Sequence, residues 1–416
     1  LAMGAAAAGT GFYVSGSAMH DKTVTTSTTT QGLWQGSDIT VGGNAALIAG
    51  EKIKVQGSDV SVGNTLTVDA KKIVLVAGEE HSSSTSKTIQ EHEGFSLSTS
   101  SGSVNAGLHQ SDADSQGTQY VNTHLNAGTL TSTSDSLQLA GAVIEADNVG
   151  IHTGALSVVS LQDTYQSKSK TVGGNVGISG GQGGVTGASI AADFQKSETE
   201  RRWVDEQSGI IGHDSLHITA DDMLLTGALI ANATRGENGH LVDQGNLQLK
   251  TNTLVVNNLY DVDRTKTIGA NLAVGFNIGS GTKVQGTQTN APAGTTSTDA
   301  ASAASKGNVP LNSITAGGLY TGHVTERTTF ATVGLGQVEV GGELLTVENA
   351  SLVNRDVANA QVITRDQDIG GLNASMTVDG RTSVSGSSMF GGMVSLRPAA
   401  YCAAAEAPKP TPLLAF

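Results

Sequence analysis

Short runs of alternating apolar and polar residues form a repeat near the start of the chain. GSDITVG at residues 36–42 recurs as GSDVSVG at 57–63, and Lys52-Ile53 recurs as Lys72-Ile73, with shifts of 21 and 20 residues. This length is typical of one solenoid turn, and Gly-rich corners divide each copy into short strands. The residues expected to point inward are Ile39, Val41, Ile53, Val60, Val62, Leu66 and Val68. The pattern predicts an all-β fold, a right-handed parallel β-helix (solenoid) whose turns stack about 4.8 Å apart.

A longer repeat, which spans several of these turns, is also present in the sequence. The block at 139–144 returns at 225–230, and three segments end in a similar Lys-Thr pair at Lys87, Lys170 and Lys266. The spacings of 83 and 96 residues between these lysines exceed a single turn. We therefore expect insertions of variable length to interrupt the solenoid.

The insertions have a period of two, which predicts β-strands with one apolar and one small or polar face. Residues 268–279 alternate strictly, and 172–203 contain a Gly-rich turn between two such strands, as in a projecting β-hairpin. Such a strand could fold onto the β-helix or project from it as an interaction hairpin needed for partner or membrane contact. The residues expected to carry the interaction are Ile268, Leu272, Val274, Phe276 and Ile278.

These patterns divide the chain into five regions. We expect a partial leading turn and insertion at 1–35 and the β-helix with its hairpins at 36–279. A flexible linker or loop tip is expected at 280–308, and the final β-helix turns at 309–395. An atypical Ala/Pro-rich tail follows at 396–416.

Composition narrows the class of function. The chain of 416 residues has 54 Gly but only 2 Trp, 6 Tyr and 7 Phe, which suits a stacked fold better than round cores. The net charge of −14 argues against nucleic acid as a partner. No apolar run approaches the roughly 20 residues of a membrane-spanning helix. The start, with Leu1 and Met3, resembles the interior of a longer chain, and the single Cys402 does not identify the compartment.

The strongest candidate for catalysis is the pair Asp221-Asp222, because paired carboxylates cleave glycosidic bonds. The Gly-His-Gly and Arg-x-Lys clusters of β-helical pectin-degrading enzymes are absent from the sequence. Glu79-Glu80-His81 and Glu91-His92-Glu93 could hold a metal, but adjacent strand residues point to opposite faces. We therefore expect that the chain is not an enzyme and that it has no catalytic, cofactor-binding or metal-binding residues.

The order of several motifs resembles a known family. TERRWVD at 199–205, SGIIG at 208–212, LTGALIAN at 225–232 and the stretch 156–171 resemble the haemagglutinin-repeat region of two-partner-secreted filamentous haemagglutinins and contact-dependent growth inhibition effectors. The resemblance covers most of residues 20 to about 395. It implies a secreted protein at the bacterial outer cell surface, exported through an outer-membrane two-partner-secretion transporter.

The resemblance also indicates a function. We expect a non-enzymatic structural fragment of a filamentous exoprotein, either an adhesin (haemagglutinin) or a stalk that delivers a toxin to a target-cell surface or outer membrane. One alternative is a membrane-engaging segment that helps to deliver a C-terminal toxin, and a weaker one is a β-helical carbohydrate-active enzyme.

Overall fold

The computed structural model describes residues 2–7, 12–182, 184–236, 239–277, 311–346, 353–379 and 383–389. Side chains are described from residue 15 onward, except at 311–312, 370–379 and 383–389. Two sheets account for the strands, one with 14 strands and one with 10. The all-β class expected from the sequence is confirmed.

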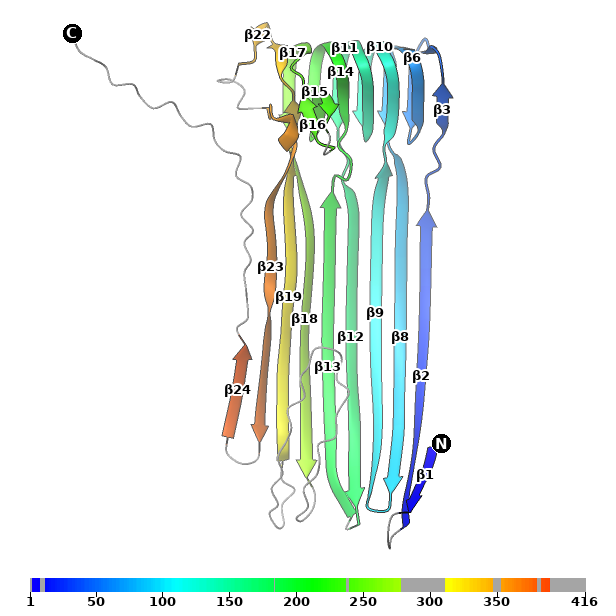
Figure 1. Cartoon of the computed structure of the whole chain (residues 1–416), viewed down its shortest axis with the longest axis vertical. Coiled ribbons are helices and arrows are strands. Elements are labelled where there is room, and N and C mark those ends of the chain that lie inside the picture. Colours follow the sequence, from blue (N-terminus) through cyan, green and yellow to red (C-terminus); the bar gives the residue numbers. More distant parts are fainter. Residues whose placement is uncertain are drawn as a thin grey trace, which may run out of the picture.

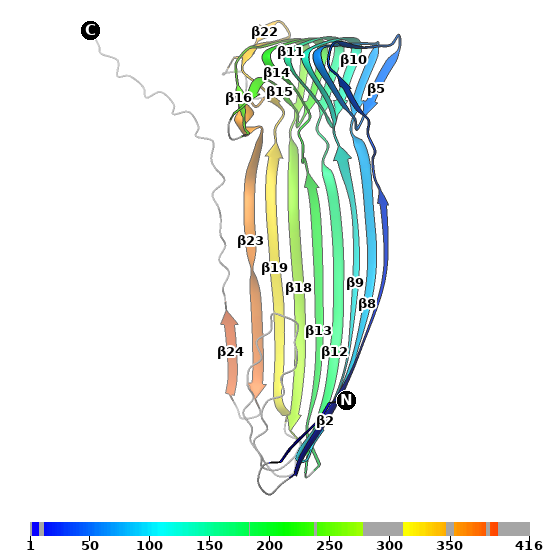
Figure 2. The ribbon, with the colours of Figure 1, turned by 45° about the vertical axis from the view of Figure 1, so that its right-hand side comes forward.

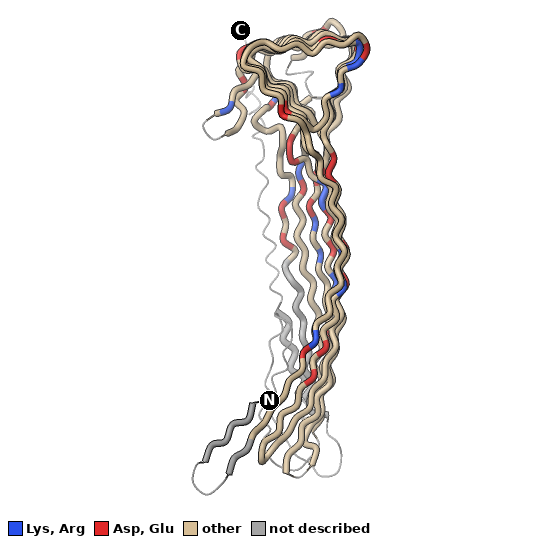
Figure 3. The backbone as a smooth tube through the Cα atoms, turned by 90° about the vertical axis from the view of Figure 1, so that its right-hand side faces the viewer, with Lys and Arg blue, Asp and Glu red and all other residues tan. Residues whose placement is uncertain are grey.

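The first sheet, which we call the parallel stack, is almost entirely parallel (Figure 1). Seen end on, its successive turns superpose as a three-sided outline (Figure 3). Its strands are β3 (Asp38–Val41), β4 (Ala45–Ile48), β5 (Lys52–Gln56), β6 (Asp59–Asp69), β7 (Lys72–Val76), β10 (Thr123–Ala140), β11 (Ala142–Val159), β14 (Gly209–Thr226), β15 (Leu229–Arg235), β16 (Leu241–Asp243), β17 (Leu247–Asn257), β20 (Thr332–Val333), β21 (Gly336–Val340) and β22 (Glu343–Leu344). A short 3-10 helix, η2 (Val357–Asn359), follows.

The second sheet, which we call the hairpin sheet, is antiparallel and consists mostly of strands of about 20 residues. Its strands hang side by side from one side of the parallel stack as one curved layer (Figures 1 and 2). In spatial order they are β1 (Ala2–Ala7), β2 (Phe12–Gly32), β8 (Gly78–Ser98), β9 (Ser101–Val121), β12 (Asp163–Gly181), β13 (Gly184–Trp203), β18 (Leu259–Asn277), β19 (Leu311–Thr329), β23 (Gln361–Asp379) and β24 (Ser383–Met389).

The short sequence repeat forms adjacent turns of the stack. Ile39 pairs in parallel with Val60, and Ile53 pairs with Ile73, at the expected shifts. The inward residues of the second turn are buried, with Val62 4% and Leu66 0% exposed. In the first turn Ile39 is 47% exposed, because no described turn lies on its outer side.

Two turns of the stack separate one hairpin from the next. β3–β5 and β6–β7 lie between β2 and β8, β10 and β11 lie between β9 and β12, and β14 and β15–β17 lie between β13 and β18. Two turns advance the stack by about 9.6 Å, which is the width of two neighbouring strands in a sheet. Because a hairpin also contributes two strands, β9 can pair with β12 and β13 with β18.

This geometry explains the longer repeat. Asp112 pairs with both Lys87 and Lys170, so the two lysines occupy one row of the hairpin sheet. In β18 the same row is occupied by Ile268 rather than Lys266. The third copy is therefore offset by two residues, a shift that leaves every side chain on the same face.

The regions expected from the sequence map onto these two sheets unevenly. The described part of 1–35 contributes β1 and β2 to the hairpin sheet. In 309–395, β20–β22 belong to the stack, whereas β19, β23 and β24 belong to the hairpin sheet. Residues 280–308 and 396–416 lie outside the described residues.

Candidate interaction surface on the hairpin sheet

Four of the five residues singled out from the alternating pattern lie on β18, in the interior of the hairpin sheet. Leu272 is 49% exposed, and Ile268, Val274 and Phe276 are half-buried. The fifth, Ile278, lies outside the described residues. β18 extends away from the parallel stack between β13 and β19, so it does not fold onto the stack.

Cross-strand pairing extends the apolar side of β18 over its neighbours. Directly opposed residues of antiparallel strands share a face, so each row can be followed across the sheet. One row, from β8 to β18, contains Phe95, Val104, Ile178, Ala188 and Phe276. The row above it, from β9 to β19, contains Ala106, Val176, Ile190, Val274 and Ile314.

The face that these rows form, which we call the apolar face, occupies the half of the hairpin sheet farther from the stack. No described element covers it (Figures 2 and 3). Its large apolar residues with roughly half or more of their surface exposed are Val24, Phe95, Leu97, Val104, Leu108, Val172, Val176, Ile178, Val185, Ile190 and Leu272. Soluble monomers rarely expose an apolar patch of this extent without a binding function.

The opposite face of the same strands is polar and rich in hydroxyl groups. Thr25 and Thr88 lie 3.2 Å apart across β2 and β8 (Oγ1 to Oγ1), and Ser197 and Thr267 lie 3.0 Å apart across β13 and β18 (Oγ to Oγ1). Such cross-strand pairs stabilise a sheet without a core on that side. The hairpin sheet is therefore amphipathic across its thickness.

Charged residues border the apolar face on its side nearest the stack (Figure 3). One row contains Asp114, Lys168, Glu198 and Lys266. Lys196 Nζ lies 2.7 Å from Glu198 Oε1, and this contact lowers the pKa of the Glu198 carboxyl, with Lys168 and Lys266 acting in the same direction. Positive and negative side chains thus alternate along this row.

A compact cluster joins the hairpin sheet to the parallel stack. The Arg327 guanidinium lies 4.0 Å from the centre of the Trp203 ring, a cation–π contact. Arg327 Nε donates to Asp261 Oδ2 at 2.8 Å, and the Asp261 side chain is 0% exposed. Thr329 Oγ1 donates to the same oxygen at 2.7 Å, and the backbone N–H of Val204 donates to Asp261 Oδ1 at 3.1 Å. These contacts join three hairpin strands at the point where they leave the stack.

Two titratable groups near this junction have raised pKa values. Burial raises the pKa of Asp163 to about 7, and its hydrogen bond with Asp205 acts in the same direction. The hydrogen bond to Glu206 raises the pKa of His124 to about 9, and Asp59 adds to this effect against the opposing effect of burial. His124 Nε2 lies 2.9 Å from Glu206 Oε1, and Nδ1 lies 2.8 Å from Asp59 Oδ1.

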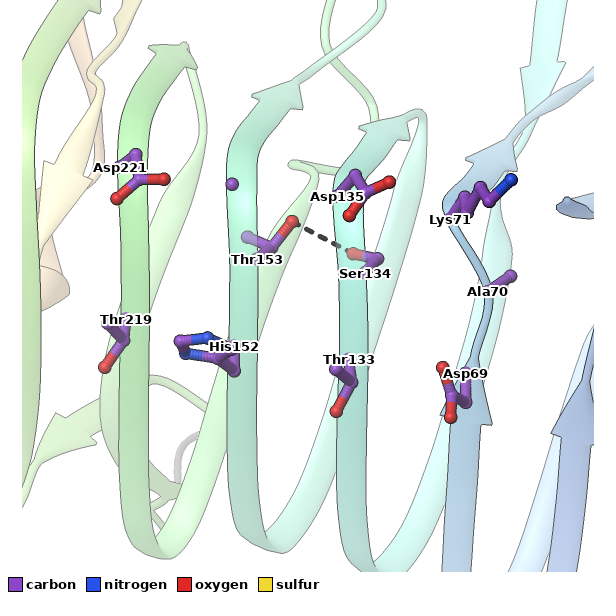
Figure 4. Close-up of a pocket in the computed structure, with 11 residues that line it drawn as sticks. Asp69, Ala70, Lys71, Thr133, Ser134, Asp135, His152, Thr153, Thr219 and Asp221 are labelled. Carbon is purple, nitrogen blue, oxygen red and sulfur yellow. Dashed lines mark hydrogen bonds between the residues drawn. The ribbon is translucent and has the colours of Figure 1, made fainter. Parts of the chain in front are cut away.

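A shallow groove on the parallel stack contains one residue of the candidate catalytic pair. Asp69, Asp135 and Asp221 line it from different turns, beside Lys71 and His152 (Figure 4). Asp222 does not line this groove; its Oδ1 accepts a hydrogen bond from Thr253 Oγ1 at 2.7 Å. The structure therefore does not place Asp221 and Asp222 together as a facing acid and base.

The remaining candidates are engaged in separate contacts. His92 Nδ1 contacts Asp21 Oδ1, and His81 Nε2 lies 3.4 Å from Glu79 Oε1. Within the described ranges, no group of three or more His, Cys, Asp or Glu side chains is arranged to hold a metal. No helix in the described part of the chain is long and apolar enough to cross a membrane.

Sequence reasoning overlooked the junction as a site. Its signal is the placement of tryptophan: the chain has only 2, and each lies where a strand of the hairpin sheet returns to the stack. Trp34 Nε1 donates to the Gly57 carbonyl oxygen at 3.0 Å, and Trp203 stacks on Arg327. Arg327 and Asp261 are far apart in sequence, so their pairing could be recognised only after the strands had been aligned.

Comparison with known proteins gives one finding. Residues 14–174 match the family model described as hemagglutinin repeat. The match covers β2 to most of β12, including four turns of the stack and the β8–β9 hairpin. No curated protein and no solved structure matches the chain.

Proposed function

Residues 14–174 are a haemagglutinin-repeat region of the kind found in filamentous haemagglutinin-like proteins, and from this premise we propose that the chain is a non-enzymatic structural segment of a secreted, cell-surface filamentous exoprotein. In this proposal the parallel stack is a right-handed β-helical rod, and the hairpin sheet is its interaction surface. The whole protein serves as an adhesin or as a stalk that presents a toxin to a target cell, and a two-partner-secretion transporter exports it.

The observation that carries this proposal is the regular addition of one hairpin for every two turns. Each unit adds to both sheets without disturbing their pairing, so the arrangement can be extended along one axis. Beyond residue 174, the strands β13, β18, β19 and β23 continue the hairpin sheet in the same antiparallel order. An extendable scaffold with an uncovered face is well suited to display binding surfaces along a filament.

The surface location can be tested with an epitope tag inserted between Thr99 and Ser100, in the turn between β8 and β9. In the producing bacterium, we expect antibody to label the tagged full-length protein on intact cells. Transporter deletion should abolish this label, while a tagged cytoplasmic protein stays unlabelled throughout. Labelling that requires permeabilised cells would refute the surface location.

A second function, membrane engagement during toxin delivery, is favoured by the apolar face. Its strands alternate large apolar residues with Gly, Ser and Asn, a pattern typical of strands that meet lipid on one side. Aromatic girdles are absent from the sequence, and Lys22 with Glu91 interrupts the face at the β2–β8 edge. Flotation of the purified chain with lipid vesicles tests this function.

The carbohydrate-active alternative rests on the groove with Asp135 and Asp221. It predicts release of sugar fragments from a bacterial or plant polysaccharide, and loss of that release in Asp221→Asn. We expect no turnover from the wild-type chain. A product that depends on Asp221 would favour the carbohydrate-active function over the structural one.

A further inference from the structure

The apolar face has the anatomy of a protein interface. Its centre is formed by β9, β12, β13 and β18, where consecutive rows contain Val104 and Ile178, then Val176 and Ile190. The exposed fraction of these four side chains ranges from 50% to 60%. An apolar centre enclosed by polar side chains is the usual organisation of a specific contact between proteins.

The polar border has two sides and carries both signs of charge. On the side nearest the stack, one row contains Lys87, Asp112, Lys170 and Lys196, and a second contains Asp114, Lys168, Glu198 and Lys266. On the β2 side, Lys22 Nζ lies 3.3 Å from Glu91 Oε2, and His20 pairs with Glu93. Basic and acidic residues are nearly equal in number along this border.

The balance of charge along this border distinguishes between two possible partners of the apolar face, a lipid membrane and another protein. Anionic lipid attracts basic side chains and repels acidic ones, so a border containing Asp112, Asp114 and Glu198 is poorly suited to a lipid headgroup layer. A protein surface with both signs of charge can match such a border. The same face of a second copy provides both signs together with an apolar centre of equal size.

The area of the face is sufficient for a stable contact. Its rows span about 27 Å along the strands, and the strands from β8 to β19 span about 24 Å across the sheet. Two copies would bury about 1,300 Å² in total, which lies within the range of specific interfaces. Two sheets packed in this way would be separated by about 10 Å, as in a β-sandwich.

We propose that two copies of this chain associate through their apolar faces, so that two hairpin sheets form a two-layer sandwich. The inference rests on the proposed function because it assigns a partner to the same interaction surface. In a filament, this contact joins two rods side by side and buries apolar side chains that each rod alone exposes.

The test is the mass of the purified chain by sedimentation velocity at several micromolar concentrations. We expect a dimer for the wild-type chain and a monomer for Val104→Asp/Ile190→Asp, with association weakened at least 10-fold. The matched control is Ser103→Asp/Ser189→Asp, which adds the same charge one residue away on the opposite face and should remain dimeric. Circular dichroism of all three proteins verifies the β fold.

Two results would overturn the proposal. One is a wild-type chain that remains monomeric at every concentration, and the other is a dimer that the Val104/Ile190 change does not weaken. If a monomeric wild type floats with vesicles and the same variant abolishes flotation, lipid is the occupant instead. Each of these results leaves the tag experiment unaffected, so a failed dimer and a failed surface location are distinguishable.

Discussion

In the parallel stack, Leu66, Leu139 and Leu225 are fully buried, whereas Val176 and Ile178 in the hairpin sheet are 50% and 56% exposed. Both regions use the same alternation of apolar and polar residues. The stack closes around its apolar side chains, so one face of its inner strands, such as β6, β10, β11 and β14, becomes a core. The hairpin sheet is a single layer with two outer faces. Alternation therefore determines which residues share a face, while closure determines whether that face is buried.

The two regions also differ in what sets their spacing. The stack advances by one strand per turn, and the hairpin sheet advances by two strands per hairpin. Pairing of β9 with β12 depends on the two turns β10 and β11 between them. The regions are therefore coupled through the strand spacing as well as through the Trp203–Arg327 junction.

The largest effect should come from a deletion that breaks the match between two turns of the stack and one hairpin of the hairpin sheet. Deleting residues 123–141 removes one turn, since Thr123 pairs with Ala142 of the next turn. The hairpins would then be one strand spacing, about 4.8 Å, too close, so β9 and β12 could not both keep their partners. We expect loss of amide-exchange protection throughout β8, β9, β12 and β13.

A longer deletion provides the control for this experiment. Removing residues 88–170 takes out one complete unit and joins Lys87 to Thr171, which occupies the same row as the Thr88 that it replaces. We expect this larger deletion to retain protection in the remaining strands of both sheets. Equal damage from both deletions would show that the spacing match does not hold the two regions together.

The next largest effect is the difference between the same kind of substitution at a buried position of the stack and at an exposed position of the apolar face. Val62→Asp places a charge among side chains packed between turns, where Val62 is 4% exposed, and should cost about 4 kcal/mol or more. Val176→Asp on the apolar face, at 50% exposure, should change the unfolding free energy of the monomeric chain by less than about 1 kcal/mol. Denaturant unfolding at low protein concentration measures both. Similar costs would mean that the two faces are equally buried in solution.

The sequence predicted much of the difference between the parallel stack and the hairpin sheet, but not all of it. The shifts of 21 and 20 residues predicted the pairing of Ile39 with Val60 and of Ile53 with Ile73, because inward residues of stacked turns must coincide. The alternation at 268–279 predicted a strand with Leu272 and Val274 on one side. The sequence did not reveal that consecutive hairpins join into one sheet, since pairs such as Val104 with Ile178 depend on long-range register.

A smaller effect is expected at the junction between the regions. Arg327→Met removes the cation that pairs with the buried Asp261 carboxylate and should destabilise the protein by about 3 kcal/mol. Arg365→Met, which removes an exposed pair with Glu326, serves as a control and should cost about 0.5 kcal/mol or less. Thermal unfolding followed by circular dichroism measures the difference. A junction variant as stable as the control would indicate that the two sheets do not depend on this contact.

The smallest expected effect is on pH dependence at the same boundary. His124 has its pKa raised to about 9 by Glu206 and Asp59, so its stabilising contribution is complete below about pH 6.5 and is lost as the pH rises through 9. Asp163, with its pKa raised to about 7, contributes stability at low pH that is lost between about pH 4 and 7.

Both groups therefore make the folded chain less stable as the pH rises, in two consecutive ranges. The His124 side chain is partly exposed, so solvent screening should limit its contribution to about 1 kcal/mol. Unfolding free energies measured from pH 4 to 10 should fall, and His124→Gln should flatten the part of this decline above about pH 7 while leaving the decline below pH 7 unchanged. Because His124 bridges Asp59 of the stack and Glu206 beyond β13, a decline that persists in His124→Gln would mean that another group controls the boundary at alkaline pH.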